Sequence, residues 1–590
     1  MLSLSYFGAL INLNHPQKYV HWSFLSISEA NLIIIGTMIV IFGLAIMLPF
    51  PKNKRDQLSK ETIAPIPPEN TNTNSKMWTY RLRHFGLKIL PPDKLLPDQQ
   101  PAYVSSWIYV FGVATLAALG LVILSGIVLA IGGVDWWQQS TIGHYFNSVH
   151  LWGVELFMAF MVIHLWGKFW MAAWRGKRAL TWMTGVLAFA ISILEAFTGY
   201  LSQQNFDSQW IATNGKDAIN ATGLGSVFNL MNFGQMISWH IVIIPLALVS
   251  VVIVHVLMVR VHGVSHPIMK TKGKAAKKAL KAAEASKWRG AYKPYDILKE
   301  AFIASIVVLV LVLGLAYLLS SPDSPPVSVA TWSRVAPADF MATVGSELAG
   351  TSETARYGPP YNNGRSYVQK IGLSWQMLAG VHDRINAAQT FVIQPLSKLG
   401  FNNPRLESDL REYQAASVKQ QRSWDMAFLS SVKRVKFINN LPILPKNSSS
   451  GPVAYMATTE LNMAQSGAID ADLLAQAPFY GTNYTKPLLF IEDGNYFSSL
   501  AKANHMTSTQ WGVMNETGSY PGQPWLWLYT LWYQIPGFSS STNVDLIAIY
   551  LTTIATAILL LVPFIPGLRD IPKRIPIYKL IWRRWYKNKE

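Results

Sequence analysis

The chain has 590 residues and is 50% hydrophobic but only 14% charged, with 22 tryptophans and a positive mean hydropathy of +0.21. Soluble domains carry about 25% charged residues, so this composition excludes an ordinary soluble protein and predicts a polytopic membrane protein. The net charge is +18, but the basic residues lie between and after apolar runs, so they indicate membrane topology and not nucleic-acid binding. Because there is no cysteine, disulfides, thiolate-bound iron–sulfur clusters and cysteine-attached cofactors are excluded, and any redox centre is non-covalent.

Seven apolar runs are long enough to cross a bilayer as helices, which predicts an all-α membrane protein. They cover approximately residues 31–50, 104–131, 145–170, 181–202, 234–259, 300–320 and 543–565. No basic segment precedes the first run, and Lys52, Lys54 and Arg55 follow it. This order favours a retained anchor over a cleaved signal peptide.

The charges between the runs predict which side of the membrane each segment occupies. Lysine and arginine gather in residues 51–103, 171–180 and 260–299 and in the tail after residue 565. Because cytoplasmic segments carry the excess of basic residues, the seven spans are expected to alternate with the N-terminus outside the cell membrane and the C-terminus in the cytoplasm. The Lys-rich stretch 270–289 is expected to form a cytoplasmic helix near anionic headgroups, with a solvated charged face as the alternative.

Four histidines lie within two of these runs. His150 and His164 are fourteen residues apart in the third run, and His240 and His255 are fifteen apart in the fifth. On a helix each pair spans roughly 21–22 Å and stays on about one face, since the rotations are about −40° and +60°. Two such helices packed antiparallel present two facing histidine pairs, one near each membrane surface, and each pair can hold a haem iron from both sides.

A lone intramembrane histidine is explained equally well by a hydrogen bond to a neighbouring helix. Four histidines at matched spacing favour ligation, because ionisable groups at this depth are costly without a function. The sequence therefore predicts two non-covalent haems and electron transfer across the membrane. His144, His262 and His266 lie at the membrane edges, where interfacial hydrogen bonding suffices, so they are left out of the ligand set.

Glycine spacing repeats the histidine spacing. Gly112 and Gly126 lie fourteen residues apart, as do Gly185 and Gly199. A glycine within a helix costs roughly 1 kcal/mol relative to alanine, so a paired spacing needs a reason. Close packing of small residues between membrane helices is the alternative to a cofactor site.

Residues 104–268 also carry three local motifs. They are Leu-Thr-Trp-Met-Thr-Gly from Leu180, Thr-Gly-Tyr from Thr198, and the segment from His255 to Pro267. With the histidines and glycines, these motifs resemble the cytochrome b subunit of quinol:cytochrome c and quinol:plastocyanin oxidoreductases, in its short chloroplast-type form. The resemblance implies a transmembrane four-helix di-haem bundle in which the glycines let the haem edges approach the backbone.

The resemblance also assigns roles to individual residues. It implies that His150 and His240 hold an outer haem b, and that His164 and His255 hold an inner haem b. The cations placed for the propionates of the inner haem, with ordinary positive-inside anchoring as the alternative, are Lys168, Arg178 and Arg260.

The chain divides into six expected parts. They are an N-terminal anchor with a basic segment (1–103), the di-haem bundle (104–268), a basic cytoplasmic loop (269–299), a membrane helix (300–321), an extracytoplasmic insertion (322–521), and a quinol-site-like segment with the last membrane helix and a basic tail (522–590). The insertion is long enough to form its own outer domain and has helical stretches over 406–435 and 453–476. It carries no metal-ligand or nucleophile cluster in its sequence, so a partner-docking or lid role is expected.

Two departures from the family concern the outer quinol site. The family's Pro-Glu-Trp-Tyr segment supplies a carboxylate as a proposed proton acceptor, but the matching stretch here, from Pro524 to Leu528, has no glutamate. The family's Pro-Trp after the third bundle helix is replaced by Gln203-Gln204. Asp207 follows closely and is the candidate substitute base, since apolar surroundings can give a carboxylate a useful pKa; an exposed loop aspartate is the alternative.

The leading hypothesis is the two-haem electron-transfer subunit of a respiratory quinol oxidoreductase, which oxidises quinol near the outer face and passes electrons to a quinone near the inner face. The resemblance alone implies a Rieske-type iron–sulfur protein and a c-type cytochrome as partners, and a homodimeric complex. The alternative is a non-bifurcating di-haem conduit fed by a partner docked on residues 322–521, which the missing glutamate favours. A proton-relay transporter or channel without haem is the third hypothesis, and it leaves the paired spacings unexplained.

Overall fold

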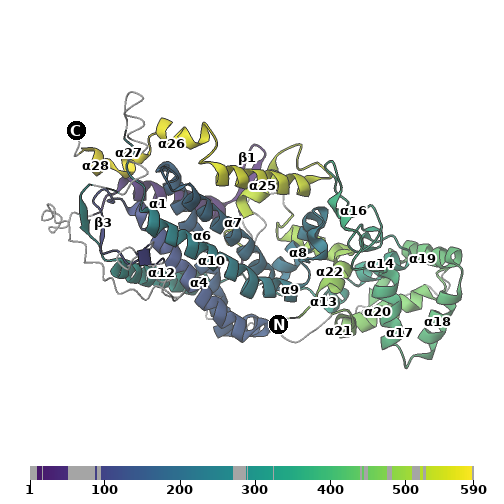
Figure 1. Ribbon diagram of the computed structural model, residues 1–590. Helices are drawn as coiled ribbons and strands as arrows, with labels where there is room; N and C mark the ends of the chain where they lie inside the picture. Colours follow the sequence, from purple (N-terminus) through teal and green to yellow (C-terminus); the bar gives the residue numbers. More distant parts are fainter. Residues whose placement is uncertain are drawn as a thin grey trace, which may run out of the picture.

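Helices built from the seven apolar runs dominate the computed structural model (Figure 1). The seven predicted spans are confirmed to within a few residues at each end. The helices are α1 (Glu29–Met47), α4 (Phe111–Gly132, preceded by the turn η2, Trp107–Tyr109), α6 (Thr141–Trp170), α7 (Ala179–Leu201), α9 (Phe233–Ser238) continuing through η4 (Trp239–Ile243) into α10 (Ile244–His262), α12 (Ile297–Leu319) and α25 (Val544–Leu561).

The structure describes most of the chain. The described residues are 10–15, 18–50, 85, 87–88, 95–269, 288, 290–322, 324–438, 441–443, 449–474, 481–507, 518–522 and 526–587. The Lys-rich stretch expected to form a helix therefore lies almost entirely outside the described residues, as do Pro524, most of the basic segment 51–103, and Lys52, Lys54 and Arg55 within it.

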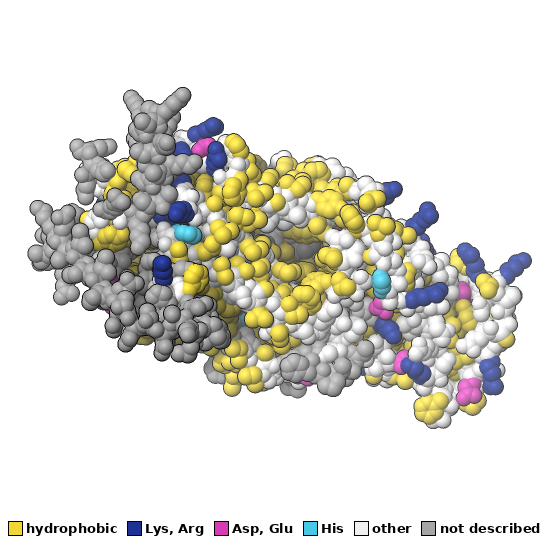
Figure 2. Space-filling model, viewed as in Figure 1, with side chains coloured by type: hydrophobic (Ala, Val, Ile, Leu, Met, Phe, Trp, Pro, Cys, Tyr) yellow, Lys and Arg dark blue, Asp and Glu magenta, His cyan; other side chains and the backbone are white. Residues whose placement is uncertain are grey.

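Side-chain caps and apolar surface explain why these segments are membrane helices. Ser28, Ser140 and Asp296 accept hydrogen bonds from the first-turn amides of α1, α6 and α12, which satisfies groups that a helix start leaves open. No more than 44% of the most apolar window of any span is buried inside the protein, so much of its surface is left for lipid. Figure 2 shows hydrophobic side chains over the middle of the molecule and lysines and arginines toward its two ends.

Four helices form the central bundle. Helix α4 packs along α6, and α7 packs along α10, while α12 covers α4 and α6 and α25 packs on α7. With these neighbours the fold is an all-α membrane protein, as the sequence predicts.

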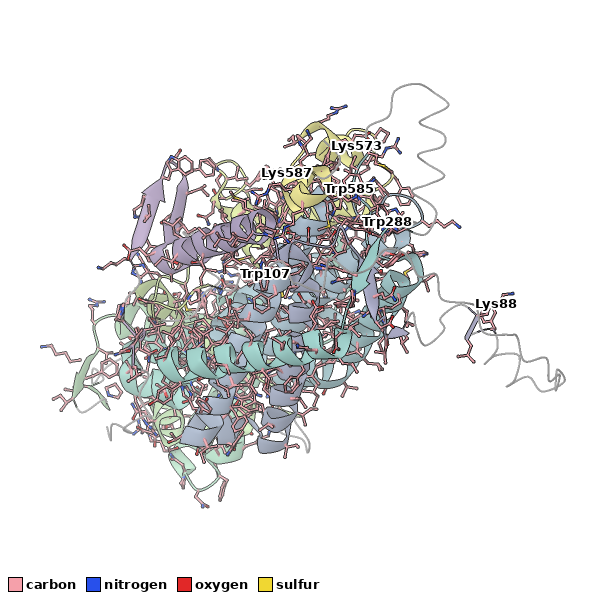
Figure 3. All side chains as sticks on the ribbon, turned by 90° about the vertical axis from the view of Figure 1, so that its left-hand side faces the viewer. Lys88, Trp107, Trp288, Lys573, Trp585 and Lys587 are labelled. Carbon is pink, nitrogen blue, oxygen red and sulfur yellow. The ribbon has the colours of Figure 1, made fainter. Side chains whose placement is uncertain are left out.

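One end of the bundle is rich in basic and aromatic side chains, and we call it the basic end. Short helices of the C-terminal tail lie here, and the antiparallel strands β3 and β4 join the segment before α4 to the segment before α12. Figure 3 looks onto this end, where Trp288 and Trp585 pack against one apolar cluster and Lys587 lies nearby. The small elements are η8 (Leu568–Asp570), α26 (Ile571–Arg574), α27 (Tyr578–Ile581), α28 (Arg583–Lys587), and the strand pairs β1 (Tyr19–Trp22) with β2 (Leu25–Ser28), β3 (Gln99–Pro101) with β4 (Tyr292–Pro294), and β5 (Lys436–Ile438) with β6 (Leu441–Ile443).

The insertion lies at the opposite end, which we call the insertion end, and it is built almost entirely of short helices (Figure 1). Helices are present in both stretches expected to be helical, 406–435 and 453–476, but the first breaks between α18 and α19 and the second between α20 and α21; residues 475–476 lie outside the described residues. The helices are α13 (Val329–Val335), α14 (Pro337–Leu348), α15 (Glu353–Arg356), α16 (Trp375–Ala379), η5 (Ala388–Ile393), α17 (Gln394–Leu399), α18 (Pro404–Ala415), α19 (Val418–Val432), α20 (Val453–Ser466), α21 (Ala468–Leu473), α22 (Thr485–Glu492) and α23 (Asn495–Ala503).

The apolar core of the insertion continues into the bundle. Helix α8 (Phe206–Ala221), which follows α7, shares one buried cluster with α9 and with the insertion helices. Phe206 of α8 meets Phe497 of α23 edge to face at 5.5 Å, and Gly234 of α9 donates a backbone hydrogen bond to Thr482. The remaining connecting elements are α5 (Val134–Gln139), η3 (Leu224–Ser226), α24 (Trp527–Leu531) and η7 (Trp532–Gln534).

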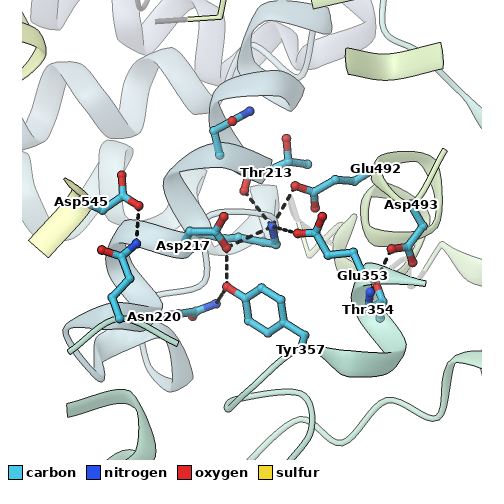
Figure 4. Close-up of polar contacts among 12 residues, drawn as sticks. Thr213, Asp217, Asn220, Glu353, Thr354, Tyr357, Glu492, Asp493 and Asp545 are labelled. Carbon is cyan, nitrogen blue, oxygen red and sulfur yellow. Dashed lines mark hydrogen bonds and ion pairs between the residues drawn. The ribbon is translucent and has the colours of Figure 1, made fainter. Parts of the chain in front are cut away.

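A buried lysine fastens α8 to the insertion (Figure 4). Lys216 is 2% exposed, and its Nζ lies 2.8 Å from Glu492, 3.2 Å from Asp217 and 3.8 Å from Glu353. Tyr357 donates a hydrogen bond to Asp217. Burial alone would lower the pKa of Lys216, but the charges of Asp217 and Glu492 outweigh it and raise that pKa, so the lysine stays charged.

Removing this lysine should loosen the joint. Lys216→Met leaves carboxylates buried without their cation, and loss of one partner of a buried ion pair costs about 3–5 kcal/mol. We expect a lower unfolding temperature of the detergent-solubilised protein and faster proteolysis within the insertion. Lys398→Met is the matched control, because the Lys398–Asp472 pair is half exposed and surface pairs contribute about 0–1 kcal/mol. Equal effects of the two variants would contradict the structural role of Lys216.

The buried carboxyl group of Glu460 is expected to make the stability of the insertion depend on pH. Glu460 of α20 is fully buried, neither of its oxygens has a hydrogen-bond partner among the described residues, and burial raises its pKa well above 4.5. The fold therefore favours the protonated form, and the stability this group contributes is present below pH 4.5 and is lost as pH rises through the raised pKa.

Glu460→Gln, which mimics the protonated form, should match the wild type at low pH and exceed its stability at pH 8. The gain is about 1.4 kcal/mol for each unit by which pH exceeds 4.5, and it stops growing once pH passes the raised pKa in the folded protein. Thermal unfolding of both proteins from pH 5 to pH 8 measures it. Glu407→Gln, on the exposed face of α18, should keep the wild-type pH dependence, and parallel curves for Glu460→Gln and wild type would contradict the assignment.

Candidate functional site

The four histidines form two pairs within the bundle. The rings of His150 on α6 and His240 on η4 face each other at the insertion end, with centroids 6.2 Å apart and planes at 90°. His164 on α6 and His255 on α10 lie toward the basic end, near enough to interact electrostatically. The structure thus brings together the partners that the resemblance implies.

A π-helical turn carries His240. Pro245 has no amide to donate to the carbonyl four residues before it, and the turn just N-terminal to it, Trp239–Ile243, is the π-helix η4. Such single π-helical turns inside a helix are frequent at functional sites. The turn changes the direction of the ring relative to a regular helix.

Each of the four paired glycines faces a histidine ring. An added Cβ would press on that ring, whereas Gly120, also on α4, has nothing within 4 Å of the same position. The sequence predicted that these glycines admit a haem edge; the described contacts are with the rings themselves. The distance from the Cβ position to the ring Cε1 is 3.0 Å for Gly112 and His164, 3.2 Å for Gly126 and His150, 3.0 Å for Gly185 and His255, and 2.5 Å for Gly199 and His240.

Hydroxyl groups orient one ring of each pair through Nδ1. Ser125 donates to the carbonyl of Val122 at 3.0 Å, so its lone pair is left to accept from Nδ1 of His150, also at 3.0 Å. Thr184 donates to backbone carbonyls of the preceding turn and lies 3.2 Å from Nδ1 of His255. A proton held on Nδ1 leaves Nε2 with the lone pair that a metal requires.

The other two rings differ from each other. Nδ1 of His240 lies 3.0 Å from the backbone oxygen of Glu195 and 3.2 Å from its carboxylate Oε1. Nδ1 of His164 has no hydrogen-bond partner among the described residues.

Sequence reasoning missed these partners, although a signal was present. Ser125 and Thr184 each directly precede a paired glycine, and Glu195 is a carboxylate within an apolar run, which is rare without a function. The residues around the histidines are therefore of the kind that hydrogen-bond the rings of metal-ligating histidines and fix their orientation.

The His150–His240 geometry fits a haem iron. Metal–imidazole bonds are about 2 Å long and a ring centre lies about 1 Å beyond its nitrogen, so two rings on one iron have centres about 6 Å apart. The observed 6.2 Å agrees. Among the described residues no group of three or more metal-ligating side chains exists, which is compatible with haem because the macrocycle supplies the other four ligands.

The three cations predicted near the inner haem lie at the basic end, but in different environments. Lys168 lies 4.8 Å above the ring of Tyr109 and acts electrostatically on both His164 and His255. Arg178 is 6% exposed and donates to the carbonyls of His262 and Gly263, so it stabilises the end of α10. Arg260 lies near Tyr295.

The edge histidines behave as expected. His144 lies 3.1 Å from the hydroxyl of Ser320, and His262 lies 3.1 Å from that of Thr181. His266 packs between aromatic rings at the basic end.

Asp207 is placed differently from the exposed-loop alternative. It lies in the first turn of α8, which begins because Asn205 accepts a hydrogen bond from the amide of Ser208, and it is fully buried. A second carboxylate, Asp545 at the start of α25, accepts hydrogen bonds from Tyr533 and Gln369, and Tyr533 lies 3.0 Å from Tyr529. Asp545 is partly exposed and lies within electrostatic range of Lys216.

Comparison with known proteins supports the family. Residues 155–326 match the family model described as Cytochrome b(N-terminal)/b6/petB, a range that contains three of the four histidines. The menaquinol:cytochrome c reductase cytochrome b subunit of Bacillus subtilis (strain 168) is 25% identical over 201 residues, which cover 30% of this chain and 90% of that protein. Cytochrome b6 of Heliomicrobium gestii is 27% identical over 137 residues, or 21% of this chain and 64% of that one.

A solved structure titled Hyperthermophilic respiratory Complex III matches over 66% of this chain and 95% of its own, with 16% identity and a TM-score of 0.26. The matched sequence range and the helical membrane fold agree with the resemblance found in the sequence. The membrane part of this chain is thus similar to bc-type cytochrome b proteins.

Proposed function

We propose that the protein holds two haem b groups, one between His150 and His240 and one between His164 and His255, and that it is the electron-transfer subunit of a membrane quinol oxidoreductase. The observation that carries the proposal is the arrangement of the four histidines in two pairs. Each ring faces a glycine, and three of the four rings have a partner at Nδ1. The relatives' names, cytochrome b subunit of menaquinol:cytochrome c reductase and cytochrome b6, support the same class of complex.

The need for two sites follows from the thickness of the membrane. A bilayer core is about 30 Å thick, and two redox centres supplied by the bound haems divide that distance for the electron. The basic end faces the cytoplasm by the excess of lysine and arginine, so the insertion and the N-terminus lie outside the cell membrane. The His150–His240 pair is then the outer site, and His164–His255 the inner one.

Quinol oxidation releases two electrons and two protons, so the outer site needs a proton acceptor. Asp207 is the carboxylate that the sequence nominates, and its complete burial argues that a quinol headgroup reaches it only through another group. Asp545, hydrogen-bonded to Tyr533, is the second candidate at the same end. Its position beside α24 and η7, which overlap and follow the stretch 524–528 that matches the family's Pro-Glu-Trp-Tyr segment, supports it.

The partners follow from the same reasoning. A quinol that sends one electron to the outer haem must send the other to a high-potential acceptor, for which a Rieske-type iron–sulfur protein and a c-type cytochrome are the family's solution. The insertion is the surface on which we expect such a partner to dock. A homodimeric complex completes the proposal.

The first test is a reduced-minus-oxidised spectrum of the purified protein, followed by addition of quinol. Two b-type components that quinol reduces, in a step blocked by outer-site inhibitors, are expected. Two components that quinol cannot reduce would contradict quinol oxidation and leave a partner-fed conduit. The absence of haem would contradict the whole proposal.

Ligand substitution should remove one haem at a time. His150→Ala or His240→Ala is expected to lower the haem content from two to one per chain, and His164→Ala or His255→Ala to remove the other, because each haem would lose one of the two histidines proposed to hold it. Pyridine haemochrome assay measures the content. His144→Ala, at the membrane edge, is the control and should keep both haems. An unchanged haem content in all four ligand variants would contradict the assignment of these histidines as haem ligands.

Gly199→Ala offers a milder version of the same test. Its methyl group would lie 2.5 Å from Cε1 of His240, so it should displace the ring and alter or empty only the outer site. Gly120→Ala, with open space around the new methyl, is the matched control and should bind both haems normally.

The proton acceptor can be tested separately. Neutralising the acting base should slow reduction of the haems by quinol about 10²- to 10⁴-fold while haem content stays at two. Stopped-flow reduction of Asp207→Asn and Asp545→Asn distinguishes the two candidates, with Asp409→Asn on α18 as the control. Wild-type rates in both variants would exclude both carboxylates.

A further inference from the structure

We propose that Glu195 lowers the reduction potential of the haem held by His150 and His240, because its carboxylate lies beside the Nδ1 nitrogen of His240, next to the backbone oxygen that bonds this nitrogen. The inference rests on the proposed function, since it requires haem at this pair. It adds a residue that neither the histidine spacing nor the glycine spacing indicates.

The contact is specific to one ring. Oε1 of Glu195 lies 3.2 Å from Nδ1 of His240, and the backbone oxygen of the same residue lies 3.0 Å from that nitrogen. One turn after Glu195 along α7, Gly199 leaves the space that the His240 ring occupies. The same helix therefore supplies both the room for the ring and an acidic group beside its Nδ1 nitrogen.

The carboxylate is held within the protein. Glu195 lies six residues before the end of a membrane-spanning helix, its side chain is 18% exposed, and its second oxygen, Oε2, is buried without a hydrogen-bond partner among the described residues. A carboxylate at this depth is costly unless it has a function. Among the described contacts, the polar group of another residue closest to this side chain is the ring nitrogen of His240.

The other histidine pair has the opposite surroundings. His255 meets the neutral hydroxyl of Thr184, His164 has no partner at Nδ1, and the cation Lys168 acts electrostatically on both rings. One pair is therefore accompanied by an acidic side chain and the other by a basic one.

These surroundings act on potential in opposite directions. A carboxylate beside the Nδ1–H of an imidazole ligand increases its imidazolate character, makes it a stronger ligand and stabilises the oxidised iron, whereas a nearby cation favours the reduced iron. With haem bound at both pairs, this difference in potential would favour electron movement from the His150–His240 pair toward the His164–His255 pair. Glu195 acts through His240 and is a positioning and tuning residue, not a catalytic one.

The test is potentiometric titration of Glu195→Gln, in which a neutral amide oxygen replaces the carboxylate in nearly the same shape. One of the two haem components should become at least tenfold easier to reduce, which is about 59 mV for one electron, and the other should stay where it is. Repeating the titration in His164→Ala, which is expected to keep only the haem at the His150–His240 pair, identifies the component that moves. The low-spin ferric electron paramagnetic resonance signal of that haem should change with it.

Glu155→Gln is the matched control. Glu155 is also a buried carboxylate in a membrane helix, but no described hydrogen bond joins it to a histidine. A similar rise of the midpoint potential in Glu195→Gln and Glu155→Gln would show that any charge within the membrane has this effect, and it would overturn the proposal. If Glu195→Gln does not accumulate in cells, Glu195→Asp is the second variant. It keeps the charge on a shorter side chain and should raise the midpoint potential of the same haem component.

The failures of the two proposals are distinguishable. A haem-free wild-type protein would refute the proposed function. A wild-type protein with two haems whose potentials are both unchanged in Glu195→Gln would refute only the role of Glu195.

Discussion

The close approach between a glycine backbone and a histidine ring is the constraint on which the membrane part depends. A side chain at any of the four glycines would meet the ring opposite, so α4 can lie along α6, and α7 along α10, only in the register that places glycine against histidine. That register also sets Ser125 and Thr184 beside the rings that they orient. Helix packing and ring orientation are therefore determined together, by residues that carry no charge.

The insertion end depends on a different principle. Apolar side chains of helix α8 pack against the insertion. They belong to one buried cluster that also contains residues of α9 and of the insertion helices. Apolar contact gives this interface its area, while Lys216 fixes its geometry through three carboxylates from three elements. Since α8 starts only a few residues after α7 ends, the surroundings of the His150–His240 pair and the insertion are parts of one continuous structure.

Much of the membrane part could be predicted from the sequence, because long apolar runs and helical spacing are local properties. The seven spans and the helices that carry the four histidines follow from them. The contact of Glu195 with His240 could not be predicted, because the two residues lie on different helices and only packing brings them together. Asp207 was expected close to the outer membrane face, with an exposed loop as the alternative; Asn205 starts a helix there, and Asp207 is fully buried. The arrangement of the helices in the insertion could not be predicted from the sequence, because these short helices are stabilised by contacts between residues distant in the sequence.

The shared core has a consequence for how the protein can be divided. A domain joined through an exposed linker can be cut out, exchanged or produced alone, because few contacts cross its boundary. Here the boundary at residue 322 does not coincide with an edge of the hydrophobic core, since Tyr200, Phe206 and Met231 are buried in the same cluster as Trp332 and Phe391. A bundle fragment cut at that point would uncover a contiguous apolar face on α8 and α9, which favours aggregation. Neither piece is an autonomous module, and any engineered exchange of the insertion would have to carry α8 and α9 with it.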